Sequence, residues 1–169
     1  MEESLKQSIV KAREFLQKVR NAAMATVNED GSPHNTPFFL LYNPSFTKIV
    51  WGSHPNSQHS KNILRTGQLF VVIYDSFGRD GFYVKAKNGH ITEGEELDET
   101  LQINNAFRAK ENKKPLEKSY YEGENPQRMW SADVEKIWVL VDERDSKGLI
   151  VQEHRREISP QELTLSSRT

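Results

Sequence analysis

The residues with the clearest capacity for chemistry lie together at the start of one predicted helix. A helix N-terminus attracts anions, because its unpaired N–H groups and the helix dipole both point outward. The same helix start carries polar side chains that can donate hydrogen bonds: Ser53, Ser57, Gln58, His59 and Lys61. The pattern indicates a phosphate site. The competing interpretation is an ordinary capped helix whose polar first turn is solvated.

Local signals define both ends of this helix. An apolar strand ends at Gly52, a short turn follows, and the helix is predicted over residues 57–66. Ser57 or Asn56 can cap the first free N–H groups. Gly67 suits the left-handed residue just past a helix end. The donors are therefore expected on the first helical turn after a strand.

Short apolar segments joined by turns fill most of the rest of the chain, which is typical of an antiparallel sheet. There are too few intervening helices for repeated βαβ units. The expected fold class is therefore mainly β with flanking helices, arranged as a small closed or split antiparallel barrel. Strands are predicted over residues 22–27, 34–42, 47–52, 69–75, 82–92, 128–142 and 149–152, helices over 4–20 and 95–112, and loops over 76–81 and 113–127.

Pro37 lies inside the predicted strand 34–42. Because proline cannot donate to a strand ladder, it indicates either an edge strand or a β-bulge. Bulges are common beside active sites, where they re-aim the backbone. The sequence leaves both interpretations of this position open.

The length and composition limit the classes of protein to consider. The 169 residues are expected to form a single domain, with an N-terminal helical segment at 1–20 and a flexible tail at 160–169. Lys+Arg 23 against Asp+Glu 24 gives no basic excess for nucleic acid or an anionic membrane. The apolar runs are too short to span a bilayer, and no secretory signal is visible. With no cysteine, thiolate chemistry is excluded, and we expect a soluble cytoplasmic protein.

Other motifs that could carry chemistry are weak. The histidines show no metal-ligand spacing, so we expect no metal site; they are His34, His54, His59, His90 and His154. No nucleophile elbow or Walker-type loop is present. The acidic residues at 95–99 suit the dipole at a helix start and are interpreted as a solvated face. No catalytic acid or base is assigned from the sequence.

Several segments follow one another in an order and spacing shared with a known family. They are Ala25–Val27, Gly31–Phe39, Trp51–Ser53, Ser57–Ile63, Leu69–Asp75, Gly81–Ala86 and Trp130–Ile158. Over nearly the whole chain this pattern resembles the pyridoxamine 5'-phosphate oxidase-like FMN-binding split barrels. The resemblance implies a homodimer with one FMN per protomer at the dimer interface. It also implies an FMN-dependent oxidoreductase that acts on a small molecule.

The resemblance also implies which residues hold the cofactor. It places Ser53 and the first helical turn at the FMN phosphate: Ser57, Gln58, His59 and Lys61. It places one strand along the isoalloxazine ring: Asn35, Thr36, Pro37 and Phe38. Trp138 and Arg156 match positions that reach the flavin from the partner subunit.

The chain departs from the family pattern at the charged ligands. Where true pyridoxamine phosphate oxidases have Arg-Arg-Lys at the FMN phosphate, this chain has Asn35, Gln58 and His59. Each charge-assisted hydrogen bond so lost contributes roughly 1.5–3 kcal/mol. Leu40 and Gln152 stand where those enzymes have cationic residues. We therefore expect a divergent relative that has a flavin-type site and lacks the pyridoxamine phosphate pocket.

This loss of basic ligands supports two further hypotheses. One is a flavin-binding carrier or sensor without turnover. The other keeps the fold and replaces FMN by the deazaflavin F420 or by haem. The absorption spectrum of protein purified from cells would distinguish these ligands.

Overall fold

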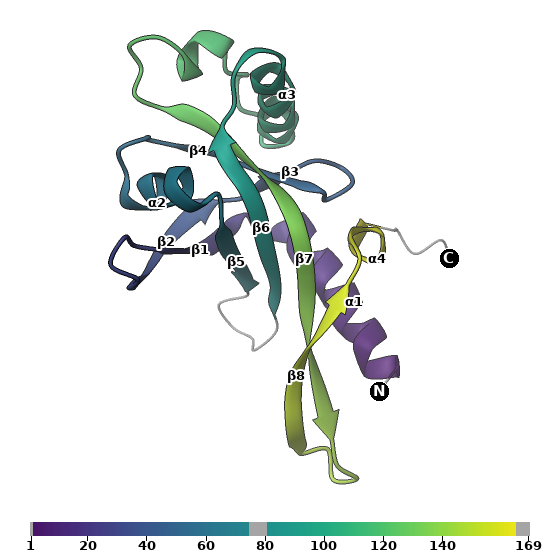
Figure 1. The fold of residues 1–169 in the computed structure, drawn as a ribbon. Coiled ribbons are helices and arrows are strands. Elements are labelled where there is room, and N and C mark those ends of the chain that lie inside the picture. Colours follow the sequence, from purple (N-terminus) through teal and green to yellow (C-terminus); the bar gives the residue numbers. More distant parts are fainter. Residues whose placement is uncertain (1, 75–80, 165–169) are drawn as a thin grey trace.

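A single curled antiparallel sheet with flanking helices forms the molecule (Figure 1), whose computed structural model describes residues 2–74 and 81–164. The sheet order is β2-β1-β5-β6-β7-β4-β3, and β8 pairs with β7 outside this path. Neighbouring strands are antiparallel throughout the described residues. The expected fold class, mainly β with flanking helices in an antiparallel split barrel, is confirmed.

The bounds of the elements follow the predicted ones closely over most of the chain. The strands are β1 (Asn21–Val27), β2 (Pro33–Phe39), β3 (Leu41–Tyr42), β4 (Lys48–Ser53), β5 (Leu69–Tyr74), β6 (Gly81–Ile91), β7 (Arg128–Arg144) and β8 (Ile150–Ile158). The helices are α1 (Glu2–Lys18), α2 (Gln58–Thr66), α3 (Gly94–Lys110) and α4 (Pro160–Thr164), with a short 3₁₀ helix, η1 (Lys118–Tyr121).

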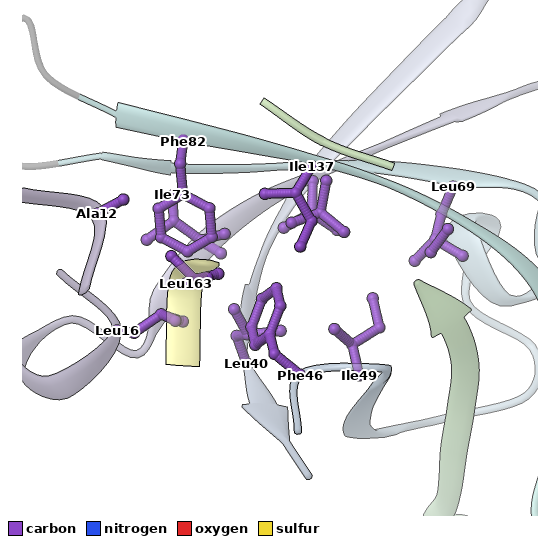
Figure 2. Packing of buried hydrophobic residues seen from close by; sticks show 14 of the residues in the cluster. Ala12, Leu16, Leu40, Phe46, Ile49, Leu69, Ile73, Phe82, Ile137 and Leu163 are labelled. Carbon is purple, nitrogen blue, oxygen red and sulfur yellow. The ribbon is translucent and has the colours of Figure 1, made fainter. Parts of the chain in front are cut away.

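The main hydrophobic core lies against the inner face of the sheet (Figure 2). Phe46, Phe82 and Ile137 are fully buried there, although they are far apart in the sequence. Helix α1 packs against β7 and adds Ala12 and Leu16 to the same core. The helix predicted over residues 4–20 is therefore present as α1, and it packs on the sheet through one apolar face.

A second, smaller core includes residues of β4, β7, α3 and η1. Side chains alternate along a strand, so Ile49 and Trp51 of β4 enter the main core while Val50 enters the second one. Val50 clusters there with Leu97 of α3 and Tyr121 of η1. Strand β4 is therefore covered on both sides, which fixes the position of its last residue, Ser53.

The structure decides between the two interpretations of Pro37. Strand β2 is at one edge of the sheet, and its pairing with β1 runs without interruption from Asn21–Phe39 to Val27–Pro33. Pro37 therefore occupies an edge strand and not a bulge. The predicted strand 34–42 is divided into β2 and β3 at Leu40, whose side chain is buried and whose N–H donates to the Arg20 carbonyl at 2.8 Å.

The C-terminal part contains more helix and strand than the sequence predicts. Strand β8 extends to Ile158, well past the predicted end at 152, and the interval expected to be a plain loop, 113–127, contains η1. Residues 160–164 of the expected flexible tail form α4, whose Leu163 is buried in the main core. The sequence did not indicate the full length of β8, because residues 152–157 are all polar and give no alternation of apolar and polar side chains. Residues 165–169 of the predicted tail and 76–80 of the predicted loop lie outside the described residues.

A charged network ties α3 to the sheet. The Glu96 carboxylate accepts hydrogen bonds from Lys48 Nζ at 2.6 Å and Ser131 Oγ at 2.9 Å, and lies 2.7 Å from His90 Nε2. Burial disfavours the carboxylate, but the hydrogen bonds from Lys48, His90 and Ser131 outweigh it and lower the pKa of Glu96 to about 2. Burial also disfavours protonated His90, whereas the Asn88 carbonyl and Glu96 raise its pKa above the usual value overall.

We expect Glu96→Gln to lower the free energy of unfolding at pH 7 by roughly 1–3 kcal/mol, a figure reduced for the partial exposure of the carboxylate. The contribution of a carboxyl with a lowered pKa is complete above its unfolded value near 4.5 and disappears as the pH falls through about 2. The contribution of His90 has the opposite sign and disappears as the pH rises through its raised pKa. Urea unfolding of both proteins between pH 2 and 9 measures these differences.

Glu95→Gln is the matched control, because Glu95 is exposed on the same turn of α3. It should change stability by less than about 0.5 kcal/mol. Equal stabilities of Glu96→Gln and the wild type at pH 7 would contradict a stabilising role for the network.

Candidate phosphate and flavin site

Helix α2 begins and ends as the sequence predicts, but its first turn is not capped as expected. Gly67 follows the helix with φ 66°, and its N–H donates to the Ile63 carbonyl at 2.7 Å. Ser57 is the N-cap residue in an extended conformation, yet its side chain makes no capping hydrogen bond. The prediction that Ser57 caps the helix with its hydroxyl is therefore wrong. The hydroxyl instead bonds to side chains around it, and the first N–H groups of α2 stay available to an anion.

Four polar side chains meet at this helix start, and we call them the serine–histidine cluster: Ser53, Ser57, His59 and Ser60. His59 Nε2 lies 2.7 Å from Ser53 Oγ and 3.2 Å from Ser57 Oγ. Ser57 Oγ donates to Ser60 Oγ at 2.8 Å. Ser53 and Ser60 are buried, and His59 is only partly exposed. The turn between β4 and α2 thus brings three hydroxyls and one imidazole together.

The electrostatics of the cluster keep His59 neutral. Burial disfavours the imidazolium, and the nearby His34 of β2 adds like-charge repulsion, so the pKa of His59 lies below its usual value. At neutral pH the cluster therefore offers an uncharged imidazole and hydroxyl groups. A phosphate bound beside the ring would reverse this balance, because an opposite charge favours the protonated form.

A buried amide holds α2 in place. Asn62 is 2% exposed, and its Nδ2 donates to Thr26 Oγ1 at 3.0 Å and to Asn28 Oδ1 at 2.9 Å. Gln58 Nε2 donates to Asn62 Oδ1 at 3.0 Å, so this predicted phosphate ligand is engaged in bracing the helix. Lys61 is exposed on the first turn. Of the predicted helix residues, the structure brings Ser57 and His59 to Ser53.

Sequence reasoning missed several residues of this site. Ser60 completes the cluster, Asn62 anchors the helix, and the Trp130 indole N–H donates to the Ser53 carbonyl at 3.2 Å. Ser60 could have been found, because it lies one helical turn after Ser57. The contacts of Asn62 and Trp130 join elements distant in sequence, and no local pattern signals them.

The residues predicted to line the isoalloxazine ring lie along a hollow of about 650 Å³ on the edge of the sheet. Asn35, Thr36 and Pro37 line it, together with Asn21 and Ala23 of β1 and other neighbours.

Phe38, the fourth residue predicted along the ring, packs instead against Trp51, with ring centres 6.2 Å apart. Side chains alternate along β2, so Phe38 points to the opposite side from Pro37. Helix α2 contacts both β1 and β2, so the serine–histidine cluster lies beside the strand that carries the hollow (Figure 1). The helix packs on the inner face, where Asn62 bonds to Thr26, whereas Asn35 and Pro37 face the hollow on the outer side of β2.

Trp138 and Arg156 do not share one face of the sheet. Trp138 pairs with Glu157, while Arg156 pairs with Val139, so their side chains leave opposite faces. The ring centres of Trp138 and Phe70 are 6.0 Å apart, and those of Phe70 and Tyr83 are 6.3 Å apart. Arg155 stacks over Tyr83 at 3.8 Å from the ring centre. We call this set of four residues, Phe70, Tyr83, Trp138 and Arg155, the aromatic face.

The chain belongs to the pyridoxamine 5'-phosphate oxidase family, whose family model matches residues 10–142, well over half of the sequence. No curated protein matches the chain in sequence. The structural neighbours described below are less than 25% identical to it, so they show the shared fold and no more.

Three solved structures illustrate this fold. A haem-binding protein from Mycobacterium smegmatis is 14% identical with a TM-score of 0.62, over 93% of this chain and 60% of that one. A Clostridium acetobutylicum protein of the pyridoxinephosphate oxidase family is 9% identical with a TM-score of 0.62, over 90% and 96%. An F420 reductase is 12% identical with a TM-score of 0.52, over 74% and 94%. The chain thus spans 60% of the length of the mycobacterial protein.

Two other features of the described residues bear on function. Histidine and acidic side chains there form no group of three or more that could hold a metal ion. No helix in the same part of the chain is long and apolar enough to cross a membrane.

We expect the His59 imidazole of the ligand-free protein to titrate below pH 6.5, because burial and His34 both disfavour its charge. Proton NMR of the histidine ring signals across pH 4–9 measures this value. His90 is the internal control, since it should titrate above 6.5 in the same spectrum. His34→Gln should raise the pKa of His59. Titration of His59 at or above 6.5 in the wild type would contradict the packing described for the cluster.

Proposed function

We propose that this protein binds FMN and acts as an FMN-dependent oxidoreductase on a small-molecule substrate. One observation carries the proposal: a donor-rich helix start lies against the inner face of the edge strand β2, and a hollow runs along the outer face of the same strand. A flavin mononucleotide needs both parts, since its phosphate and its ring are held by different groups. The family membership supports the same ligand.

The phosphate would be held by neutral donors. The hydroxyls of Ser53 and Ser57 and the N–H groups of the first turn of α2 all suit phosphate oxygens. His59 would add a charge-assisted hydrogen bond once protonated. The residues present therefore fit a phosphate, although without the arginine and lysine side chains typical of the family pattern.

The isoalloxazine ring would lie along Asn35, Thr36 and Pro37 in the hollow. A bound flavin would itself supply the hydride or electron transfer. Among the described residues that line the hollow, none carries a charge at pH 7. The protein's part is to orient the ring through neutral hydrogen bonds and apolar contacts and to exclude water from one side of it.

A homodimer is the proposed assembly. The aromatic face presents Phe70, Tyr83 and Trp138 on the sheet surface, partly exposed in the single chain. Apolar aromatic surface of this kind is typical of interfaces. A second copy packed on it would bring Trp138 near a flavin held by the other protomer, as the family resemblance implies. Arg156 would approach from the opposite face of the β7–β8 hairpin.

The alternative is the same fold with another ligand or without turnover. The observation that favours it is the lack of formal positive charge in the serine–histidine cluster at neutral pH. Proteins of this fold include one named as haem-binding and one named as an F420 reductase. A flavin carrier or sensor would use the same contacts. The absorption spectrum of the protein purified from cells separates flavin, deazaflavin and haem.

We expect the preference for FMN over riboflavin to be highest near neutral pH and to decline toward pH 8–9. A bound phosphate raises the pKa of His59, so the added affinity is complete below the free pKa and disappears as the pH rises through the bound one. The second pKa of the phosphate, about 6, lowers its charge on the acid side. Calorimetric titration of both flavins from pH 5.5 to 9 measures the ratio of their affinities. At pH 7, binding of FMN should be accompanied by proton uptake, whereas binding of riboflavin should not.

His59 variants test the assignment. His59→Lys should flatten the alkaline decline, because lysine stays charged across this range. His59→Ala should lower the preference for FMN at every pH. A constant FMN-to-riboflavin ratio in the wild type would show that His59 does not contact the phosphate.

We expect the wild type to be a dimer at micromolar concentration and Trp138→Glu to be a monomer. A carboxylate at this position would lie opposite Glu157, its partner in the strand register, and would be desolvated in the interface. Light scattering measures the mass of each protein. Tyr120→Glu is the matched control, because Tyr120 is an exposed aromatic residue on η1, away from the aromatic face. A monomeric wild type would remove the proposed interface and the flavin site that depends on it.

A further inference from the structure

A second hollow of about 320 Å³ lies at the outer rim of the second core. It is bounded by the end of β2, by Gly52 of β4, by α3 and by the segment that carries η1. We call it the α3 pocket. Gly52 contributes only backbone to its wall, and a methyl group there would meet the Tyr121 ring at 3.6 Å. Position 52 therefore has room for a methyl group in ordinary contact with Tyr121, and the glycine adds no side chain to the pocket.

Exposed aromatic rings line this pocket. Phe39 is 42% exposed and Tyr120 is 43% exposed, which is high for side chains of this size. Phe39 packs against Phe107 of α3, with ring centres 4.9 Å apart and planes at 62°. These three rings come from β2, α3 and η1 and border one space. Such walls suit a flat apolar group that can stack or pack edge-on.

The charge around the rings has one sign. Arg108 and Lys113 line the pocket, and no carboxylate is among its described lining residues. Lys113 Nζ lies 6.0 Å from the centre of the Phe107 ring. Arg108 Nε donates to the Lys114 carbonyl at 2.6 Å, which holds the guanidinium at the rim. The pocket therefore combines apolar walls with a cationic rim, and this favours an anion carried on an aromatic ring.

The α3 pocket adjoins the larger hollow along β2. Phe39 follows Pro37 by two positions, so both side chains leave the same face of the strand. Asn21, which pairs directly with Phe39, lines the larger hollow. A ligand in the α3 pocket would thus lie next to the place proposed for the isoalloxazine ring.

We propose that the α3 pocket binds a small planar aromatic anion with a single ring or two fused rings. The volume is at the lower end of the range for small-molecule sites, which matches a ligand of this size. The further assignment of this ligand as the substrate rests on the proposed flavin function. Binding itself depends only on Phe39, Phe107, Tyr120 and the two cations.

Calorimetric titration of 2-naphthoate into the full chain, with and without saturating FMN, tests the pocket. We expect saturable binding with one site per chain. The neutral analogue 2-naphthalenemethanol should bind at least about tenfold more weakly, which is the size of one charge-assisted contact. In the double variant Arg108→Gln/Lys113→Gln the two ligands should bind equally weakly. Phe39→Ala should weaken both ligands.

Two variants serve as controls. Lys110→Gln removes a cation from the same helix at a position that lines a different hollow, and should leave naphthoate affinity unchanged. Arg108→Lys keeps the charge and should retain most of the affinity. Naphthoate binding that is absent, or equal in the wild type and the double variant, would overturn the proposal.

The outcomes separate this proposal from the flavin function. Naphthoate binding in a protein that does not bind FMN would support the pocket and contradict the substrate role. FMN binding without naphthoate binding would contradict the pocket and leave the flavin function standing. Binding of both, with naphthoate shifting the flavin absorption bands, would support the pocket as the substrate site.

Discussion

The arrangement of the whole molecule depends on one long strand that pairs with three others. Strand β7 joins β4 over its first part, β6 over its middle and β8 over its last part. Its first residues position Ser53 through two interactions. Arg128 pairs with Ser53 in the sheet, and the Trp130 indole N–H donates to the Ser53 carbonyl. Its later residues carry Trp138 on the aromatic face. The register of β7 therefore sets the phosphate end of the candidate site and the surface proposed for the partner.

The phosphate site proposed at the serine–histidine cluster contains no arginine or lysine. The hydroxyls and N–H groups are positioned by β4 and α2, and Asn62 locks the helix against β1. Neutral donors bind a dianion less strongly than cations do, because no formal charges attract it. In the proposed site, the affinity for phosphate would depend on the proton of His59, whose pKa lies below its usual value in the ligand-free protein. An imidazole in place of a permanent cation would make the attraction between the proposed site and a phosphate depend on pH.

The α3 region carries the pocket that we propose for an aromatic anion. The network of Glu96 with Lys48, His90 and Ser131 fixes the first turn of α3 on the sheet. The second core then holds the rest of the helix together with η1. The α3 pocket remains open at the rim of this core, beside Gly52. A rigid support of this kind is what a pocket beside a flavin needs, since its walls must keep their geometry when a ligand binds.

The sequence by itself determined the antiparallel class, the limits of α2 and the donor-rich turn before it. These features follow from local rules, namely strand alternation, the left-handed glycine after a helix and the order of short elements. Only the tertiary structure decided that Ser57 bonds to its neighbours rather than capping α2, that Arg155 rather than Arg156 shares a face with Trp138, and that Phe39 and Tyr120 border one pocket. Each of these depends on strand register or on contacts between distant segments. A shift of one residue in a pairing reverses the faces of a whole strand, and no local pattern fixes that register.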